Sequence, residues 1–414
     1  MNPFELQTKK TKTVFYPLSQ LALKSYDKYD VDPYTKTRII LMNGTEFESN
    51  WFYHQFARHC SNNDIRRDVA EIRRVEQQQQ KRIASLKPID ETILETTLSY
   101  EQLAVDLTAI LAQKEKNETV KAQLNFALLE DFDHLYRFAD LLEMEEGQNY
   151  RKLIGNYTEI MPGRPTVSEH RNPVDDIRKA VNFAYADVAT KLSISTIIAA
   201  EQQTMNYYMN VGSFYHSELG RKLYSEIAMI EEQHVSGYES LKDPNMTWLE
   251  CMVAHEYTEC YLYYSCYMDE TDSFIKRVWE KHFNDELIHL NRAVKLLEKY
   301  EGKEYRDVMP VAEFPQLLSF KDNKKYIREV LKNIRLTAQQ ELYAPVSSLK
   351  AGNSFSIYQN AVVKNPTEAP SHKVIDNYIK KNGKDLRYEI ASHPEKALQN
   401  RQVDNVNIGR VASE

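Results

Sequence analysis

Glycine and proline are scarce in this chain of 414 residues, which has 11 of the first and 14 of the second. Both residues are typical of turns and loops, so their scarcity favours long helices joined by few tight turns. Cysteine is scarcer still, and the four cysteines form no C-x-x-C pair. A disulfide framework, a zinc ribbon and a rubredoxin-type iron site are therefore not expected.

Long apolar runs and an excess of basic residues are also missing. No run approaches the roughly 20 apolar residues that cross a membrane. The net charge of -7 at pH 7 argues against binding to nucleic acid or to anionic lipid. The first residues, MNPFELQTKKTKTV, lack the apolar stretch of a signal peptide. With 42% hydrophobic and 27% charged residues, the composition is that of a folded protein, which we expect in the reducing cytoplasm.

The patterns divide the chain into three parts. Residues 1–88 are predicted to form an irregular arm, up to about residue 50, and then a helix whose polar run VEQQQQKR faces solvent. Residues 89–300 carry apolar residues at steps of three and four, as the helices of a bundle do. Residues 301–414 are predicted to hold one further helix, over about residues 323–342, and an extended tail.

One spacing occurs three times in the middle part. A glutamate is followed 30 positions later by an acid, and that acid is followed three positions later by a histidine. The three sets are Glu101, Asp131 and His134; Glu201, Glu231 and His234; and Glu256, Glu286 and His289. An acid and a histidine three positions apart lie on one face of a helix. If each gap of 30 residues is a helical hairpin, the lone glutamate faces the acid and the histidine at equal depth.

Turn sequences and apolar stripes support these hairpins. The midpoints of the three gaps, residues 116, 216 and 271, fall in or close to polar sequence. Apolar residues flank the candidate ligands at helical steps, which places nine ionisable groups on core-facing stripes. An unpaired buried carboxylate is very costly, whereas two divalent cations would neutralise four carboxylates and accept the histidine nitrogens. Carboxylate together with imidazole suits iron or manganese.

This pattern resembles the ferritin-like di-iron carboxylate superfamily, in which a Glu helix and an E-x-x-H helix are followed by the same two helices again. The resemblance rests on Glu201 with EEQH at 231–234, Glu256 with ELIH at 286–289, and Glu101 with DFDH at 131–134. It covers about residues 90–300 and implies an all-α fold, a ferritin-like antiparallel bundle extended to about six core helices. It also implies two metal ions, iron or manganese, held among these nine residues.

A ferritin-like site needs four helices, and the three hairpins supply six. In such a site the lone-Glu helices run antiparallel, because a long crossover joins the two halves. Only 22 positions separate His234 from Glu256, so the second and third hairpins should run the same way. The 67 positions between His134 and Glu201 leave room for a crossover. Hairpin one therefore has suitable polarity to pair with either hairpin two or hairpin three, and we prefer a site made by hairpins one and two. A site of hairpins two and three, in which every acid is Glu, and a site shared by all three stay open.

The resemblance implies a non-haem di-iron or iron–manganese oxidoreductase that activates O₂ or peroxide. Its partners would be a small-molecule substrate, an external electron donor and a second copy of the chain in a homodimer, with no nucleic acid and no membrane. The same residues allow two alternatives, which are an iron-binding ferroxidase of the storage type and a metal-free structural bundle held by ion pairs. The sequence assigns no catalytic residue and no substrate.

Overall fold

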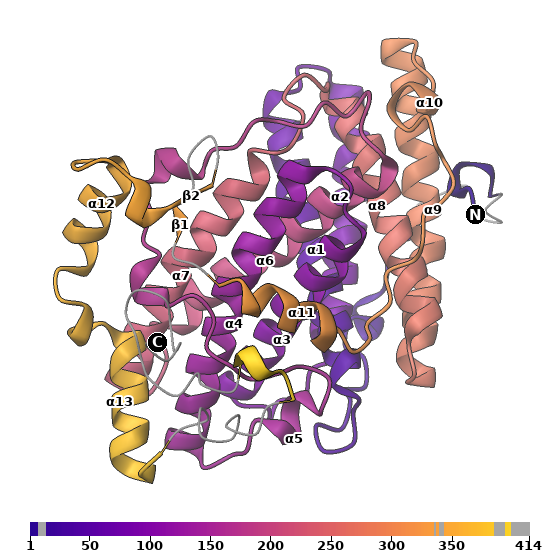
Figure 1. The fold of residues 1–414 in the computed structure, drawn as a ribbon. Coiled ribbons are helices and arrows are strands. Elements are labelled where there is room, and N and C mark those ends of the chain that lie inside the picture. Colours follow the sequence, from indigo (N-terminus) through magenta and orange to yellow (C-terminus); the bar gives the residue numbers. More distant parts are fainter. Residues whose placement is uncertain (7–13, 335–336, 339–342, 385–393, 399–414) are drawn as a thin grey trace. The chain divides into compact units, whose positions relative to one another are not determined.

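The computed structural model describes residues 1–6, 14–334, 337–338, 343–384 and 394–398. This part of the chain is almost entirely helical (Figure 1), which confirms the all-α prediction. The longer helices are α1 (Pro33–His59), α2 (Asn63–Ala84), α3 (Ile93–Lys114), α4 (Glu118–Glu146), α6 (Val188–Val211), α7 (Glu218–Glu239), α8 (Trp248–Asp269) and α9 (Ser273–Glu301). The shorter ones are α5 (Arg151–Ile154), α10 (Tyr305–Val308), α11 (Lys324–Lys332), α12 (Ser354–Val363) and α13 (Pro370–Asn382). Two short strands, β1 (Thr337–Ala338) and β2 (Ala344–Pro345), form an antiparallel pair.

The helices group into two compact units. As far as the chain is described, the first unit comprises residues 1–91, 180–203 and 242–320, and the second comprises the rest. The first unit therefore contains the hairpins α1–α2 and α8–α9 together with most of α6. The second contains the hairpin α3–α4, the end of α6, helix α7 and the C-terminal helices. The expected core of about six helices is too small, because α1 and α2 extend it to eight.

Capping residues explain where the hairpin helices begin and end. Helices α3 and α8 start with capping boxes, in which Thr92 and Thr247 each exchange hydrogen bonds with a glutamate three positions later. These bonds satisfy N–H groups that have no partner within the helix. Helices α4 and α9 end at Gly147 and Gly302, both with φ of 65°. Glycine adopts this left-handed conformation at little cost.

The helix boundaries repeat at an offset of 155 residues. Helices α2, α3 and α4 return with unchanged lengths as α7, α8 and α9, and α1 and α6 start at Pro33 and Val188. Several polar residues recur at the same offset: Glu46 and Glu201, Tyr53 and Tyr208, Glu76 and Glu231, Gln78 and Gln233, Ser85 and Ser240, Glu101 and Glu256, and His134 and His289. We interpret the chain as an internal duplication in which α1–α4 is followed by α6–α9.

Local hydrogen bonds recur with the helices. The backbone N–H of Tyr16 donates to Gln78 on α2 at 2.7 Å, and that of Arg171 donates to Gln233 on α7 at 2.8 Å. Each bond ties the segment that precedes a repeat to the second helix of that repeat. The duplication thus includes the approach to each first helix, outside the hairpins themselves.

The two repeats do not coincide with the two units. Each unit takes one complete hairpin from one repeat and combines it with helices of the other. Only residues 85–92 join α2 to α3, and only residues 240–247 join α7 to α8. The hairpins α1–α2 and α3–α4 of the first repeat nevertheless belong to different units.

Two predictions for the N-terminal part are wrong. The irregular arm ends well before residue 50, because α1 begins at Pro33 behind the N-cap Asp32. Many polar residues of α1 are buried together with the apolar ones. The sequence of α1 therefore does not show the apolar residues at steps of three and four that reveal a helix. The run VEQQQQKR does not simply face solvent either, since Glu76 and Gln79 within it are fully buried.

Helices continue into the C-terminal part, where short helices and extended segments were expected beyond about residue 344. Its described residues include α11, α12 and α13. The predicted helix over residues 323–342 is too long, because α11 ends at Lys332 and Thr337–Ala338 form strand β1, while residues 335–336 and 339–342 lie outside the described part. Helix α13 packs on α4 and α7 of the second unit, and Val374 and Ile375 on it are fully buried.

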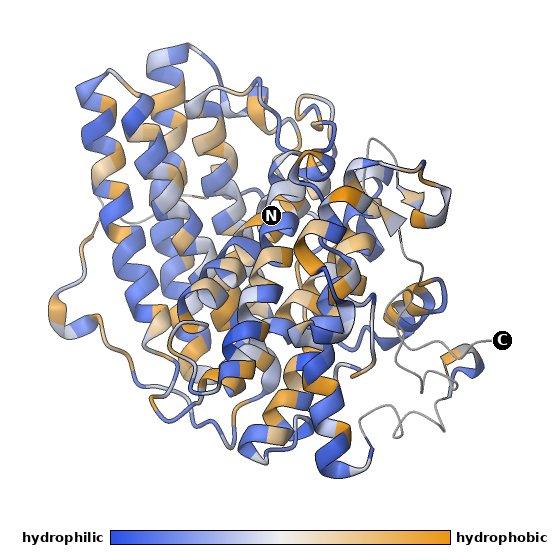
Figure 2. Ribbon diagram, turned by 90° about the vertical axis from the view of Figure 1, so that its left-hand side faces the viewer, coloured by the Kyte–Doolittle hydropathy of each residue, from blue (hydrophilic) through white to orange (hydrophobic). Residues whose placement is uncertain are grey.

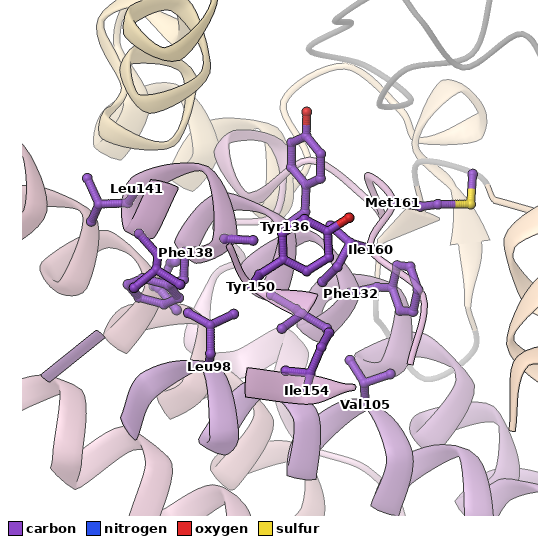
Figure 3. Close-up of a cluster of buried hydrophobic side chains, with 14 of the residues drawn as sticks. Leu98, Val105, Phe132, Tyr136, Phe138, Leu141, Tyr150, Ile154, Ile160 and Met161 are labelled. Carbon is purple, nitrogen blue, oxygen red and sulfur yellow. The ribbon is translucent and has the colours of Figure 1, made fainter. Parts of the chain in front are cut away.

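A large apolar cluster holds the second unit together. Its side chains come from α3, α4, α5 and the segment that follows α5, among them Leu98, Val105, Phe132, Ile154 and Met161 (Figure 3). Blue and orange residues alternate along most helices in Figure 2, as expected where one helix face is buried and the other is not. Within the described residues, no helix is both long enough and apolar enough to cross a membrane.

A buried ion pair in the first unit supports a stability prediction. Arg38 on α1 donates to Glu270 from Nε at 3.0 Å, and their side chains are 3% and 0% exposed. Arg38→Met would leave Glu270 buried without its cation, so we expect the free energy of unfolding at pH 7 to fall by about 3–5 kcal/mol. Arg67→Met, in an exposed pair with Asp64, should change it little. Urea unfolding of both variants measures the difference.

The pH dependence gives this prediction a second test. Burial raises the pKa of Glu270, but the charge and hydrogen bonds of Arg38 lower it by a larger amount. The pKa of Glu270 in the folded protein therefore lies below the ordinary value for glutamate. A carboxylate with a lowered folded pKa stabilises the protein above its unfolded pKa and loses that effect in acid. The difference in the free energy of unfolding between wild type and Arg38→Met should therefore become smaller as the pH falls below about 4.3. A gap that widens in acid would contradict this account of the pair.

Candidate metal centres

The second unit brings two of the predicted sets together. Nδ1 of His134 on α4 lies 2.9 Å from Oε1 of Glu231 on α7. Nδ1 of His234, one turn after Glu231, lies 3.3 Å from Oδ1 of Asp131. All four side chains have no exposed surface. Hairpin one therefore meets the return helix of hairpin two, which is the pairing preferred in the sequence analysis.

Glu231 stands at the centre of this arrangement. Ligand atoms of Glu101, His134 and Glu231 lie within 4.8 Å of one another, and Oε2 of Glu231 also lies 3.4 Å from Nδ1 of His234. Burial raises the pKa of Glu231, but hydrogen bonds from His134 and His234 bring it down to about 2. The low pKa favours the ionised carboxylate, which has an imidazole next to each oxygen, and Asp131 approaches the same nitrogen of His234 as Glu231 does.

A second carboxylate orients His234 from behind. Nε2 of His234 pairs with Glu130, and Nη1 of Arg171 donates to Glu130 at 2.6 Å. Burial alone would raise the pKa of Glu130, but Arg171, with His234, holds it well below its usual range. Histidines that bind metals commonly donate their other ring nitrogen to a carboxylate in this way. Glu130 is therefore engaged on the far side of the imidazole, and Asp131 is the acid on the near side.

The lone glutamates of these two sets are assigned to different units. Glu101 on α3 accepts a hydrogen bond from the hydroxyl of Tyr208, near the end of α6. Glu201 is buried seven residues before Tyr208, in the portion of α6 that belongs to the first unit. Residues seven apart share one helix face. Glu201 therefore stays a predicted ligand, on the face of α6 that carries Tyr208.

The first unit joins the third predicted set to a hairpin that the sequence analysis did not assign to a site. Nδ1 of His289 lies 2.7 Å from Oε1 of Glu76 on α2 and 2.9 Å from Oε2 of Glu286. It also lies 3.9 Å from Oε2 of Glu256 on α8. Ligand atoms of these four buried residues fall within 4.8 Å of one another. Hairpin three thus pairs with α1–α2, outside the three arrangements left open.

Glu76 belongs to a second group as well, with Glu46 and Glu259. All three side chains are fully buried, and no described residue donates a hydrogen bond to their Oε2 atoms. Burial, together with the neighbouring Glu76, raises the pKa of both Glu46 and Glu259 well above the usual range. This part of the unit concentrates buried carboxyl groups, whose ionised form a bound cation would favour.

Hydroxyl and amide groups contact the other oxygens of both clusters. The hydroxyl of Tyr53 donates to Glu256, and the amide of Gln79 donates to Glu286. Tyr53 and Glu256 lie 155 residues from Tyr208 and Glu101, the pair that forms the same bond in the second unit. The two units therefore repeat a tyrosine–glutamate contact as well as a central glutamate, which is Glu76 in one and Glu231 in the other.

The residues missed by the sequence analysis are Glu46, Glu76 and Gln79. Their signal was present, because Glu76 follows Glu46 by 30 positions and Gln79 follows Glu76 by three. The pattern went unrecognised because its last member is an amide and because the preceding helix lacks a clean apolar stripe. Glu259 is a near neighbour of Glu256 in sequence, and the structure places it in the second group of the first unit rather than in competition with Glu256.

No protein-family model matches this sequence, and neither a curated protein nor a solved structure matches the chain. The interpretation of the two clusters therefore rests on their own residues and geometry.

A stability measurement tests whether the carboxylates of the first unit repel one another in metal-free protein. Glu259→Gln removes one buried charge beside Glu46 and Glu76 while keeping the shape of the side chain. We expect the free energy of unfolding of chelator-treated protein to rise by about 1–3 kcal/mol. Glu218→Gln, at an exposed position of α7, is the control and should have little effect. A marked loss of stability in Glu259→Gln would instead indicate that Glu259 stabilises the metal-free fold.

Proposed function

We propose that the chain is a non-haem oxidoreductase with two dinuclear metal centres, one in each unit, which hold iron or iron with manganese. One observation carries the proposal: each unit has two adjacent sets of ligand atoms that share a single glutamate. Those glutamates, Glu76 and Glu231, are equivalent in the duplication. A carboxylate common to two neighbouring cation positions is suited to bridging them.

In the first centre, Glu76 would bridge a position held by Glu256, Glu286 and His289 and a position held by Glu46 and Glu259. In the second centre, Glu231 would bridge a position held by Glu101 and His134 and a position held by Asp131 and His234. Glu201 is the counterpart of Glu46 in the duplication and stays a predicted ligand. Carboxylate oxygens and imidazole nitrogens from facing helices are the donor set of di-iron and di-manganese bundle proteins.

The donors of the two centres differ in one respect. Gln79 stands in the first centre where His234 stands in the second, and Glu259 adds a carboxylate where the first repeat has Ala104. The first centre therefore has five carboxylates and one imidazole, and the second has three carboxylates and two imidazoles. Since carboxylate-rich sites suit manganese and imidazole suits iron, we propose that the first centre accepts manganese more readily.

When bound, such metals supply one-electron redox chemistry and a place for O₂ or peroxide to react. The residues of this chain would hold the ions at fixed spacing and exclude water from them. Tyr53 and Tyr208 would keep the oxygens of Glu256 and Glu101 in place by hydrogen bonding. Glu130 would keep a proton on Nε2 of His234, so that Nδ1 would be unprotonated and could bind a metal. Electrons would come from a separate reductase.

Elemental analysis of purified protein loaded anaerobically with ferrous iron tests this proposal. We expect about four ions per chain and about two in either Glu76→Ala or Glu231→Ala, because each removes one bridge. Glu232→Ala is a matched control, since it changes the adjacent exposed acid on α7, and it should keep all four. The loaded protein should consume O₂ or hydrogen peroxide with a chemical reductant, and the double variant Glu76→Ala, Glu231→Ala should not.

Other outcomes have distinct meanings. Failure to bind any metal after anaerobic loading would contradict the proposal and favour a structural bundle held by ion pairs. Uptake of many more ions per chain than four would favour iron storage. If Glu231→Ala and Glu232→Ala lost equal amounts of bound metal, metal binding would not depend on Glu231 as a bridging ligand.

A further inference from the structure

A cavity of about 240 Å³ lies in the first unit and borders the proposed first centre. Its walls come from α1, the first part of α6, α8 and the segment between α7 and α8. Glu259 is one of its lining residues, so the cavity reaches a carboxylate of the cluster. No described residue donates a hydrogen bond to Oε2 of Glu259, which is fully buried.

Most of the wall is apolar or aromatic. The ring of Phe52 lies 5.1 Å from that of His255 and 5.8 Å from that of Trp248, centroid to centroid. Leu262 and Met246 also line the space. Aromatic walls of this kind favour a flat ring, because rings gain from offset stacking and from edge contacts.

The polar part of the wall is a chain of charged groups that ends at Glu259. Nε2 of His255 lies 3.5 Å from Oε1 of Glu259, and Nδ1 lies 3.2 Å from Oε2 of Glu48. Oε1 of Glu48 lies 3.6 Å from Nζ of Lys242, whose side chain is 43% exposed. Asp243 lines the cavity too. Three carboxylates against two cationic side chains give this edge an excess of acceptors, so it suits a hydrogen-bond donor and disfavours an anion.

The volume limits the size of the ligand. Cavities that bind drug-sized ligands span roughly 300–1,000 Å³, whereas an apolar cavity of about 150 Å³ can hold benzene. A space of about 240 Å³ therefore accommodates one aromatic ring with a small substituent.

We infer that this cavity binds a single-ring aromatic molecule with one hydrogen-bond donor, a phenol or an aromatic amine, and presents the donor to Glu259. The ring lies against Phe52 and Trp248, and the hydroxyl or amino group donates to the carboxylate that borders the metal cluster. The role of this molecule as the substrate of the first centre rests on the proposed function, whereas its binding does not.

Calorimetric titration of the full-length protein with phenol and with aniline tests the inference, in the chelator-treated form and in the iron-loaded form. We expect saturable binding at one site per chain. Benzoate, an anion of similar size, and toluene, which has no donor, should bind at least about tenfold more weakly, since buried polar groups left unpaired cost affinity.

Two variants fill the cavity from different helices. Ala254→Leu on α8 and Ser195→Leu on α6 should each abolish phenol and aniline binding while metal content stays at the wild-type level. Ala361→Leu, at an exposed position of α12, is the control and should bind as wild type does. Two fillers are used because either one alone could disturb folding, which circular dichroism would reveal.

The outcomes separate this inference from the proposed function. If neither form of the protein shows saturable binding of phenol or aniline while metal binds normally, the inference is overturned and the proposal of metal centres is unaffected. Binding that survives both filling variants would overturn it as well, because the ligand would then lie elsewhere. Phenol binding that is lost in both fillers, in a protein that takes up no metal, would support the cavity and contradict the metal centres.

Discussion

The burial of carboxylates is the constraint on which the rest of this structure depends. In the first unit alone, five fully buried glutamates form two groups that share Glu76, and one of the groups includes His289. Removing an ionised carboxylate from water is costly unless it is paired or bound to a cation. The helices, with their caps and apolar stripes, position these acids. The burial of apolar side chains around them offsets the free energy that burying the carboxylates costs. A fold that retains such a cluster in two copies has a use for it.

The duplication explains how one chain forms two such clusters. Each cluster joins residues of both repeats within one unit, Glu76 with His289 in the first and His134 with Glu231 in the second. The duplication also explains how the copies could diverge, because a change such as His to Gln in one of them leaves the other intact. The result is one cluster with two imidazoles and one with a single imidazole.

Much of this could be predicted from the sequence, and the limits have physical causes. The three E-x-x-H or D-x-x-H hairpins and their turns were found because they combine a fixed spacing with apolar stripes. Helix polarity allowed hairpin one to pair with hairpin two or with hairpin three, and the structure brings His134 of hairpin one to Glu231 of hairpin two. The partner of hairpin three was missed, because α1 buries Thr35, Lys36 and Thr37 along with its apolar residues and shows no clean period. The fourth copy of the spacing, Glu46, Glu76 and Gln79, was not recognised because its last residue is an amide, which is not an expected metal ligand.

Anomalous X-ray diffraction from crystals of the iron-loaded protein, recorded at the iron absorption edge, tests the central claim most directly. The account predicts two pairs of peaks per chain, one pair beside Glu76 and one beside Glu231, with the two ions of each pair about 3.5–4 Å apart. Single peaks, or peaks remote from these two glutamates, would contradict the claim that each of them bridges a dinuclear centre.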